Sequence, residues 1–372
     1  MLFEYNYRNY NYRLFFYTLA LNVVGVLIIN SATNQNAAVV NKQIIGILVG
    51  MGLAIGLSLI DYHKIINLHT LVYAACVLSL IAVLIFGKNV NNATRWIVVP
   101  GIGQLQPSEF VKIGLIVTFA WYFSKYHEGI NSLPVLGGTL LLFAVPVGLI
   151  LNQPNLSTSL ITAFTVAAMI YAAGISYKWI FGVLGVMIPF GGVTAYLLQY
   201  EMIPFIRPYQ AKRILAFLNP IKYAETDYQQ ANSVMAIGSG KLMGKGLFNN
   251  TFASVKNGNF LSEEQTDFIF AVIGEELGFI GCVVVIGLFA LLVFECLHMA
   301  SRAKDLSGRL ICTGMAALLA FQAFSNIAVA TRLFPNTGLP LPFVSSGVSS
   351  LISVYIGIGI VLNVGLQRKI SS

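Results

Sequence analysis

The sequence predicts an all-α, polytopic integral membrane protein with about ten transmembrane helices and one large extracellular loop. Hydrophobic residues make up 57% of the 372 positions and charged residues only 10%, whereas soluble domains carry roughly 25% charged residues. The mean hydropathy is +0.77. Apolar runs of transmembrane length recur along the chain without the alternation of barrel strands, so they indicate helices.

Ten apolar segments can be separated along the chain. The first is preceded by Arg8 and Arg13, as in a signal peptide, but it is longer than a signal core and nine segments follow, so we expect an uncleaved helix. The fourth is short, and we expect it to gain length from the preceding QPSE stretch. The segments span residues 14–32, 43–60, 69–86, 109–123, 133–151, 157–174, 179–199, 268–297, 310–331 and 344–366.

Basic residues in the short loops favour one orientation. If the N-terminus is cytoplasmic, ten Lys and Arg residues lie inside and five outside, so both termini are placed in the cytoplasm. Within a single 1–372 membrane domain, the 200–267 loop is then extracytoplasmic. The net charge of +8 is explained by basic flanks of membrane segments, and we expect no nucleic acid as partner. The inside set is Arg8, Arg13, Lys64, Lys125, Lys178, Arg302, Lys304, Arg309, Arg368 and Lys369, and the outside set is Lys42, Lys88, Arg95, Lys112 and Arg332.

Cysteine and histidine patterns give no sign of a metal or disulfide site. The four cysteines lie in or beside apolar segments without a CxxC pair, and the four histidines are scattered. We therefore expect neither a disulfide framework nor a His-ligated metal.

The loop after the third segment, NNATRWIVVPGIGQLQPSEFVKI, carries unusual chemistry for a membrane protein. Trp96 is typical of an interface anchor. Ser108 is a candidate N-cap for the fourth segment, with Glu109 in its first turn. Glu109 and Lys112 share a helical face, which predicts either a structural ion pair or a pair that lines a polar cavity.

Three further outer stretches contain helix breakers. LNQPNLSTSL (151–160) predicts a tight turn in which Ser157 or Thr158 caps the next helix. AIGSGKLMGKGL (236–247) is either a flexible loop or a loop whose backbone approaches an anion, although it is no Walker A motif. RLFPNTGLPLPFVSSGVSS (332–350) breaks regular structure at membrane depth, which predicts an outward-opening cavity near residues 335–350.

Scarce carboxylates crowd at the front of the eighth segment. Asp267 lies where the outer loop meets the apolar run, so partial desolvation would raise its pKa and suit a general base. The alternative is that Asp267 is only the N-cap of this segment. We expect Glu275 and Glu276 to border a polar cavity, or Glu276 to pair with a neighbouring helix. The cluster comprises Glu263, Glu264, Asp267, Glu275 and Glu276, five of the chain's 14 acidic residues.

Six motifs follow one another along the chain: NATRWI, QPSEFVKI, RILAFLNP, YQQANSVMAIGSGKLMGKG, TDFIFAVIGEELGFIG and PNTGLPLPFVSSGVSSL. With them the chain resembles the SEDS family (shape, elongation, division and sporulation), which includes RodA, FtsW and SpoVE. The resemblance extends from the first segment to the tenth.

The resemblance implies a glycosyltransferase that polymerises lipid II into glycan strands at the outer face of the bacterial cytoplasmic membrane. It also implies a class B penicillin-binding protein as the partner that crosslinks the product. The family's essential aspartate corresponds to Asp267, and its other motif residues to Glu109, Lys112 and Arg95.

The implied chemistry needs one base and several cations. Asp267 would take the proton from the 4-hydroxyl of the acceptor GlcNAc, whose oxygen attacks C1 of the donor MurNAc and releases undecaprenyl diphosphate. The candidates for holding the diphosphate are Arg95, Arg207, Arg213 and Lys112. No cofactor is certain, and a divalent cation, Mg or Mn, stays open because the sequence shows no ligands for it.

Several positions depart from the family's usual pattern, and other functions stay open. The rivals are a lipid II flippase or other transporter, and a non-catalytic scaffold for a transpeptidase. GKG after SG, a short N-terminus and the lack of a C-terminal tail favour an elongation-type, RodA-like member over a division or sporulation member. The departures are Ser262 and Gln265 before the aspartate, Asn155 and Ser157 in the QPNLST turn, Ser346 at a tyrosine position, and the charge of Arg332.

Overall fold

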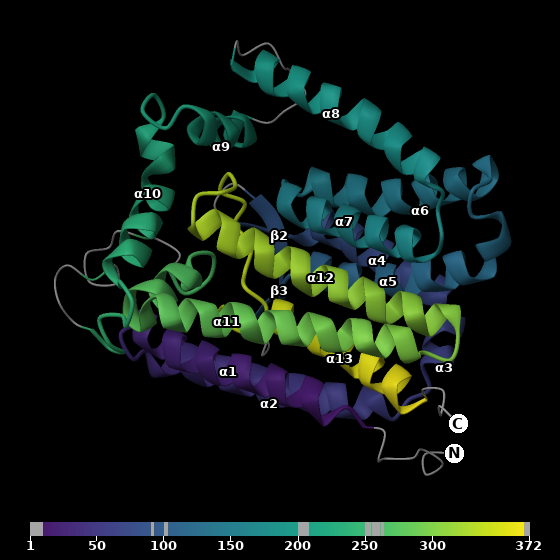
Figure 1. Cartoon of the computed structure of the whole chain (residues 1–372), viewed down its shortest axis with the longest axis horizontal. Coiled ribbons are helices and arrows are strands. Elements are labelled where there is room, and N and C mark those ends of the chain that lie inside the picture. Colours follow the sequence, from purple (N-terminus) through teal and green to yellow (C-terminus); the bar gives the residue numbers. More distant parts are fainter. Residues whose placement is uncertain are drawn as a thin grey trace.

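The computed structural model describes residues 10–90, 93–99, 103–199, 208–249, 254, 261 and 264–367, which fold into a bundle of long helices (Figure 1). The helices are α1 (Tyr12–Ala32), α2 (Ala37–Ser58), α3 (Tyr62–Asn67), α4 (His69–Phe86), α5 (Pro107–Lys125), α6 (Leu133–Asn152), α7 (Leu156–Ala172), α8 (Tyr177–Gln199), α9 (Pro208–Leu218), α10 (Ala224–Ser239), α11 (Ile269–Arg302), α12 (Leu306–Ala330) and α13 (Val348–Leu366), with a short 3-10 helix at His127–Gly129.

Each of the ten predicted segments lies in a helix, which confirms an all-α, multi-pass membrane protein. Eight helices of the described ranges are long and apolar enough to cross a membrane: α1, α2, α4, α6, α8, α11, α12 and α13. α7 is a shorter apolar helix. α5 begins at Pro107, so the fourth segment does gain length from the QPSE stretch, although its N-cap is Gln106 and not Ser108.

The centre of the bundle is formed by α5, α12 and α13, most of whose side chains are buried. α13 packs against α2 and α5, and α12 packs against α11, α5 and α7. α8 differs from the other long helices, because it lies at the edge of the bundle (Figure 1) and most of its large apolar side chains are exposed. α9 and α10 belong to the 200–267 loop and lie at one end of the bundle, so the described part of this loop is largely helical.

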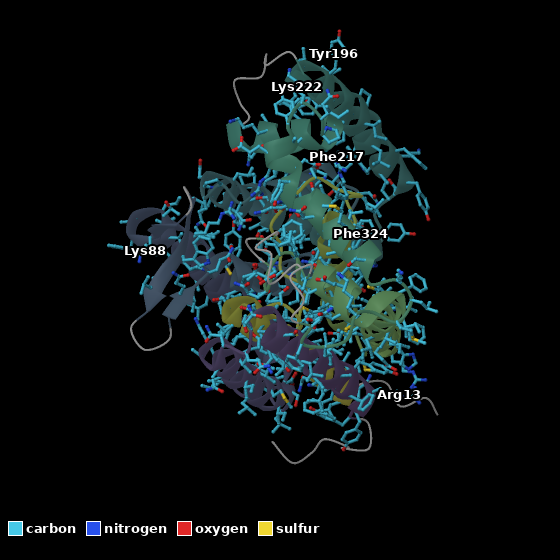
Figure 2. All side chains as sticks on the ribbon, turned by 90° about the vertical axis from the view of Figure 1, so that its left-hand side faces the viewer. Arg13, Lys88, Tyr196, Phe217, Lys222 and Phe324 are labelled. Carbon is cyan, nitrogen blue, oxygen red and sulfur yellow. The ribbon has the colours of Figure 1, made fainter. Side chains whose placement is uncertain are left out.

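A small antiparallel sheet, which the sequence analysis did not predict, joins α4 to α5. Its strands are β1 (Lys88–Val90), β2 (Ala93–Val99) and β3 (Gly103–Leu105), in the order β1-β2-β3. β2 is rich in the β-branched and aromatic residues that favour strands. Figure 2 views the end of the bundle where the sheet lies, with Lys88 on its outer side.

α11 is broken near its start, at Gly278. This residue has φ 66° and ψ −165°, a conformation that is essentially restricted to glycine. The break leaves helix carbonyl and amide groups without their usual partners, and the glycine-rich stretch supplies new ones. The N–H groups of Lys245 and Gly246 donate to the carbonyls of Glu275 and Glu276, at 2.9 and 3.0 Å.

The glycine-rich stretch therefore has a structural role, and both interpretations from the sequence were incomplete. It is packed against the break in α11, so the amides of Lys245 and Gly246 already have acceptors and do not face an anion. The side chain of Lys245 also forms an ion pair with Glu275, at 2.7 Å.

The carboxylates at this break are held by protein and not by a polar cavity. Glu275 and Glu276 are both buried. The hydroxyl of Ser31 on α1 donates to Glu276 at 2.5 Å, so the alternative that Glu276 pairs with a neighbouring helix is confirmed. The expectation that both carboxylates border a polar cavity is wrong, because both side chains are enclosed by protein and at most 2% exposed.

We predict that Gly278→Ala destabilises the protein far more than Gly287→Ala in the same helix. A Cβ at Gly278 would lie 2.3 Å from the Gly244 nitrogen, whereas a Cβ at Gly287 meets nothing within 4 Å. The backbone strain alone costs about 1–3 kcal/mol. Thermal unfolding in detergent measures the difference, and equal midpoints for the two variants would contradict the role of the break.

Candidate functional site

The α12–α13 loop, residues 331–347, meets the segment that precedes α11 at one end of the bundle. The backbone N–H of Ser346 donates to the Gln265 carbonyl at 2.9 Å. The hydroxyl of Ser345 donates to the Thr266 carbonyl at 2.5 Å. Irregular backbone among membrane-spanning helices needs protein partners for its polar groups, and these bonds provide them. The loop is thereby fixed against the residues just before Asp267.

Asp267 is half-buried and lies two residues before the start of α11. The N-cap of this helix is Phe268, so the alternative that Asp267 is the N-cap is wrong. Gly338 of the α12–α13 loop has φ 66°, and a Cβ there would lie 3.0 Å from Asp267 Oδ2 and 3.9 Å from Arg213 Nη1. Glycine at this position therefore leaves room for a carboxylate and a guanidinium beside the same stretch of backbone.

Arg213 reaches this point from α9. Its side chain is half-buried, and Nη1 donates to the Asn336 carbonyl at 3.3 Å. α9 lies at the end of the bundle that faces the viewer in Figure 2, where Phe217 of the same helix is labelled. The structure thus brings Asp267 and Arg213 together, whereas Arg207, another predicted cation, lies outside the described residues.

One buried amide ties the Asp267 backbone to the α12–α13 loop. Asn326 on α12 is buried, and its Nδ2 donates to the Asp267 carbonyl at 2.9 Å and to the Leu339 carbonyl at 2.6 Å. Its two N–H groups therefore fix the position of Asp267 relative to the residue that follows Gly338. Asn326 was not among the residues predicted from the sequence.

The Glu109–Lys112 pair lies beneath the loop. The two side chains form an ion pair at 2.9 Å and are only 3% and 1% exposed. Lys112 Nζ also donates to Gln322 Oε1 at 3.0 Å, and Gln322 Nε2 donates to the Pro340 carbonyl at 3.2 Å. Substrate binding by the two residues stays a prediction, and in the structure they form a buried support of the α12–α13 loop.

Arg95 on β2 binds the neighbouring turn between α6 and α7. Its guanidinium donates to the carbonyls of Gln153, at 3.3 Å, and Pro154, between α6 and α7. The hydroxyl of Ser157, at the start of α7, donates in turn to the Thr337 carbonyl. Arg95 is therefore connected to the α12–α13 loop through the α6–α7 turn.

The cap of α7 differs from the prediction. α7 begins at Leu156, and the side chain of Asn155 accepts a hydrogen bond from the Thr158 N–H at 3.3 Å. Asn155, one of the departures from the family pattern, is thus the N-cap in place of the predicted Ser157 or Thr158.

The unexpected charge of Arg332 is explained by α10. Arg332 Nη2 pairs with Asp227 Oδ2 at 2.6 Å. On the same face of α10, Gln230 Nε2 donates to the Val329 carbonyl at 3.0 Å and the Ser233 hydroxyl donates to the Ala330 carbonyl at 2.7 Å. These side chains dock α10 on the C-terminal end of α12, where the α12–α13 loop begins.

A sequence signal for the missed residues exists. Gln322 and Asn326 are polar, lie four residues apart in an apolar helix, and so share one face. Polar side chains within membrane helices usually face protein or water, which makes such a pair a candidate site marker. Among the described residues, no group of three or more His, Cys, Asp or Glu side chains could hold a metal ion.

A family model described as "Cell cycle protein" (FTSW_RODA_SPOVE) matches residues 12–370 of the chain. The chain is 36% identical to "Probable peptidoglycan glycosyltransferase FtsW" of Trichlorobacter lovleyi over 95% of the chain and 92% of the relative. It is 32% identical to "Peptidoglycan glycosyltransferase MrdB" of Escherichia coli K12 over 95% of the chain and 93% of the relative.

Solved structures are similar over nearly the full length. A chain from "Structural coordination of polymerization and crosslinking by a peptidoglycan synthase complex" matches with a TM-score of 0.80 and 29% identity, covering 96% of this chain and 98% of that one. The crystal structure of the rod shape determining protein RodA from Thermus thermophilus matches with a TM-score of 0.68 and 29% identity, covering 96% and 97%.

We predict that Lys112→Met lowers the free energy of unfolding by about 3–5 kcal/mol, because it leaves the buried Glu109 carboxylate without its cation. The double variant Glu109→Gln/Lys112→Met should recover most of that loss. Lys125→Met, at the exposed end of the same helix, is the control and should change the stability little. Unfolding in detergent tests this, and similar losses for Lys112→Met and Lys125→Met would contradict the support role.

Proposed function

The chain belongs to the FtsW/RodA/SpoVE family of cell cycle proteins, and from this premise we propose how Asp267 carries its activity. The protein is a multi-pass membrane enzyme of cell-wall synthesis, a peptidoglycan glycosyltransferase that polymerises glycan strands. The observation that supports Asp267 as its general base is its half-buried carboxylate, which lies beside Gly338 together with the Arg213 guanidinium.

The proposed reaction transfers the lipid-linked disaccharide of lipid II. One carboxylate oxygen of Asp267 accepts the proton of the acceptor's GlcNAc 4-hydroxyl as its oxygen forms a bond to C1 of the donor MurNAc. The bond from C1 to the diphosphate oxygen breaks, and undecaprenyl diphosphate leaves with the electron pair. Arg213 is the described cation best placed to stabilise the charge on the diphosphate, and Arg207 remains a further candidate.

Asn326 and the Glu109–Lys112 pair act as positioning residues in this proposal. Asn326 holds the backbone of the base, and the ion pair holds Gln322, which binds the same loop from below. A reacting pair must be aligned closely, and small displacements of a base lower the rate steeply. Arg95 has the same kind of role at the α6–α7 turn, and a divalent cation, Mg or Mn, stays open.

The undecaprenyl tail needs an apolar surface that opens to lipid. α8 lies away from the centre of the bundle, and α7 and α12 carry exposed aromatic side chains, such as Phe164 (50% exposed) and Phe324 (55% exposed; Figure 2). We assign the tail to this side of the bundle, next to α8, because a lipid tail then reaches Asp267 from within the bilayer.

The proposed site faces the outside of the cell, and both termini are cytoplasmic. Support comes from the ends of the helices, because Lys64, Lys125, Lys178, Lys304 and Arg309 lie at the end opposite Asp267. The likeness to a chain of a peptidoglycan synthase complex supports a class B penicillin-binding protein as the crosslinking partner. Relatives of both the FtsW and the MrdB kind match, and we propose the elongation role.

We predict that Asp267→Asn lowers polymer formation by about 10²–10⁴-fold, because the amide cannot accept the proton. The assay adds lipid II in detergent to the protein with its transpeptidase partner and separates the glycan products on a gel. Asp61→Asn, at the opposite end of the bundle, is the control and should keep wild-type activity.

The outcomes separate the rival functions. Equal polymer from wild type and Asp267→Asn would refute the general base and direct attention to other carboxylates. If folded wild type with its partner made no polymer, a flippase or a scaffold would become the better explanation. A flippase would transport lipid II without consuming lipid II that is already in the outer leaflet.

We predict that Asn326→Leu lowers the turnover number by about 10–100-fold while the KM for lipid II changes less than about twofold, because the base is displaced and binding is not. Asn363→Leu is the matched control, since Asn363 is equally buried and also bridges backbone groups, but at the opposite end, where it bonds Ser58 and Tyr62. Equal losses of turnover in the folded fractions of both variants would refute the positioning role.

A further inference from the structure

A polar cavity lies at the end of the bundle opposite Asp267. It has a volume of about 400 Å³ and lies between the 3-10 helix, the end of α7 and the turn from α11 to α12. Polar and basic residues line one side of the cavity, and small residues line the other. The lining residues are His127, Ala172, Ala173, Gly174, Ala303, Lys304, Asp305, Leu306 and Arg309.

The two cationic side chains of this cavity are free to bind an anionic ligand. Lys304 and Arg309 are exposed, and neither forms an ion pair with another described residue. With His127 counted as neutral, these two cations and the single carboxylate of Asp305 give the lining a net charge of +1.

Asp305 does not neutralise these cations by contact, because both of its oxygens are already occupied. Burial raises the pKa of Asp305, but the hydrogen bonds that it accepts outweigh burial and hold the pKa below its ordinary value, so the group is ionised at neutral pH. Its hydrogen-bond partners are Ser307 Oγ at 2.6 Å, Tyr62 Oη at 2.7 Å, the Gly308 N–H at 2.9 Å and His63 Nε2 at 3.1 Å.

Exposed aromatic side chains place this cavity at the depth of lipid headgroups. Tyr126 precedes His127, Tyr171 precedes Ala172, and both tyrosines are exposed. Tyr171 also meets the exposed ring of Tyr177 on α8, with ring centroids 6.5 Å apart. Tyrosine and tryptophan concentrate where membrane helices cross the headgroup region, so the cavity opens toward lipid headgroups and not only toward bulk water.

We propose that this cavity binds the phosphodiester headgroup of an anionic phospholipid. The net charge of the lining complements the single negative charge of such a headgroup. Basic pockets between membrane helices bind anionic headgroups by this combination of charge and depth. The lipid would join the 3-10 helix and α7 to the α11–α12 turn, far from the polymerisation site, so the proposal is independent of the role of Asp267.

The test measures which lipid the purified full-length protein retains. Wild type in mixed micelles of phosphatidylglycerol and phosphatidylcholine is examined by native mass spectrometry, and we expect one retained phosphatidylglycerol. Lys304→Gln/Arg309→Gln should weaken this retention by about tenfold, since each basic residue near an anionic headgroup contributes to binding. Ala172→Trp, which fills the cavity and keeps both charges, should weaken the retention to a similar degree.

The control is Lys64→Gln/Lys178→Gln, which removes two exposed charges at the same end but outside the lining. It should retain phosphatidylglycerol as wild type does. Equal retention by wild type and Lys304→Gln/Arg309→Gln would overturn the proposal, and so would an equal loss in the control, because that indicates diffuse attraction. If inorganic phosphate displaced the lipid, the site would bind a free anion, and the proposal of a phospholipid ligand would be overturned. Thermal unfolding verifies that every variant is folded.

Discussion

An irregular backbone among membrane-spanning helices must have its polar groups satisfied by protein, and the candidate site depends on how the α12–α13 loop meets this constraint. Asn326 and Gln322 on α12 bind the loop from the membrane side, and Ser345 binds it to the segment before α11. Ser345 thereby fixes the residue before Asp267, and Asn326 also binds the Asp267 carbonyl. The same set of hydrogen bonds therefore satisfies the polar backbone groups of the loop and positions the candidate base.

The few charged residues of the chain also hold irregular segments in place. Buried ion pairs are rarely a net gain in stability, but the loss of one partner is costly, so a pair specifies one arrangement. The pair of Lys112 and Glu109 supports the α12–α13 loop, that of Lys245 and Glu275 closes the break in α11, and that of Arg332 and Asp227 docks α10. Of the carboxylates crowded at the front of α11, Glu275 and Glu276 are used structurally, whereas Asp267 is only half-buried.

The helices could be predicted from the sequence, and Asp267 could be singled out as the candidate base, because the signals for both are local. An apolar run of membrane length indicates a transmembrane helix, and the TDFIF motif distinguishes one aspartate from the other acidic residues. The polarity of Asn326 marks it as a candidate, but the partners of Asn326 and the neighbours of Gly338 could not be predicted, because they belong to segments far away in the chain. The glycine-rich stretch was misjudged for the same reason, since its amides could face an anion or a broken helix, and only the fold decides which.

Amide hydrogen exchange in the wild-type protein tests most directly whether the α12–α13 loop is fixed as described. The N–H groups of Leu341 and Ser346 donate to Ser345 Oγ and to the Gln265 carbonyl, so both should exchange as slowly as helical amides of α13. Slow exchange at both positions would support a preformed loop that holds Asp267 in place. Exchange as fast as in an exposed loop would contradict it, because the contacts that position Asp267 would then be absent in much of the population.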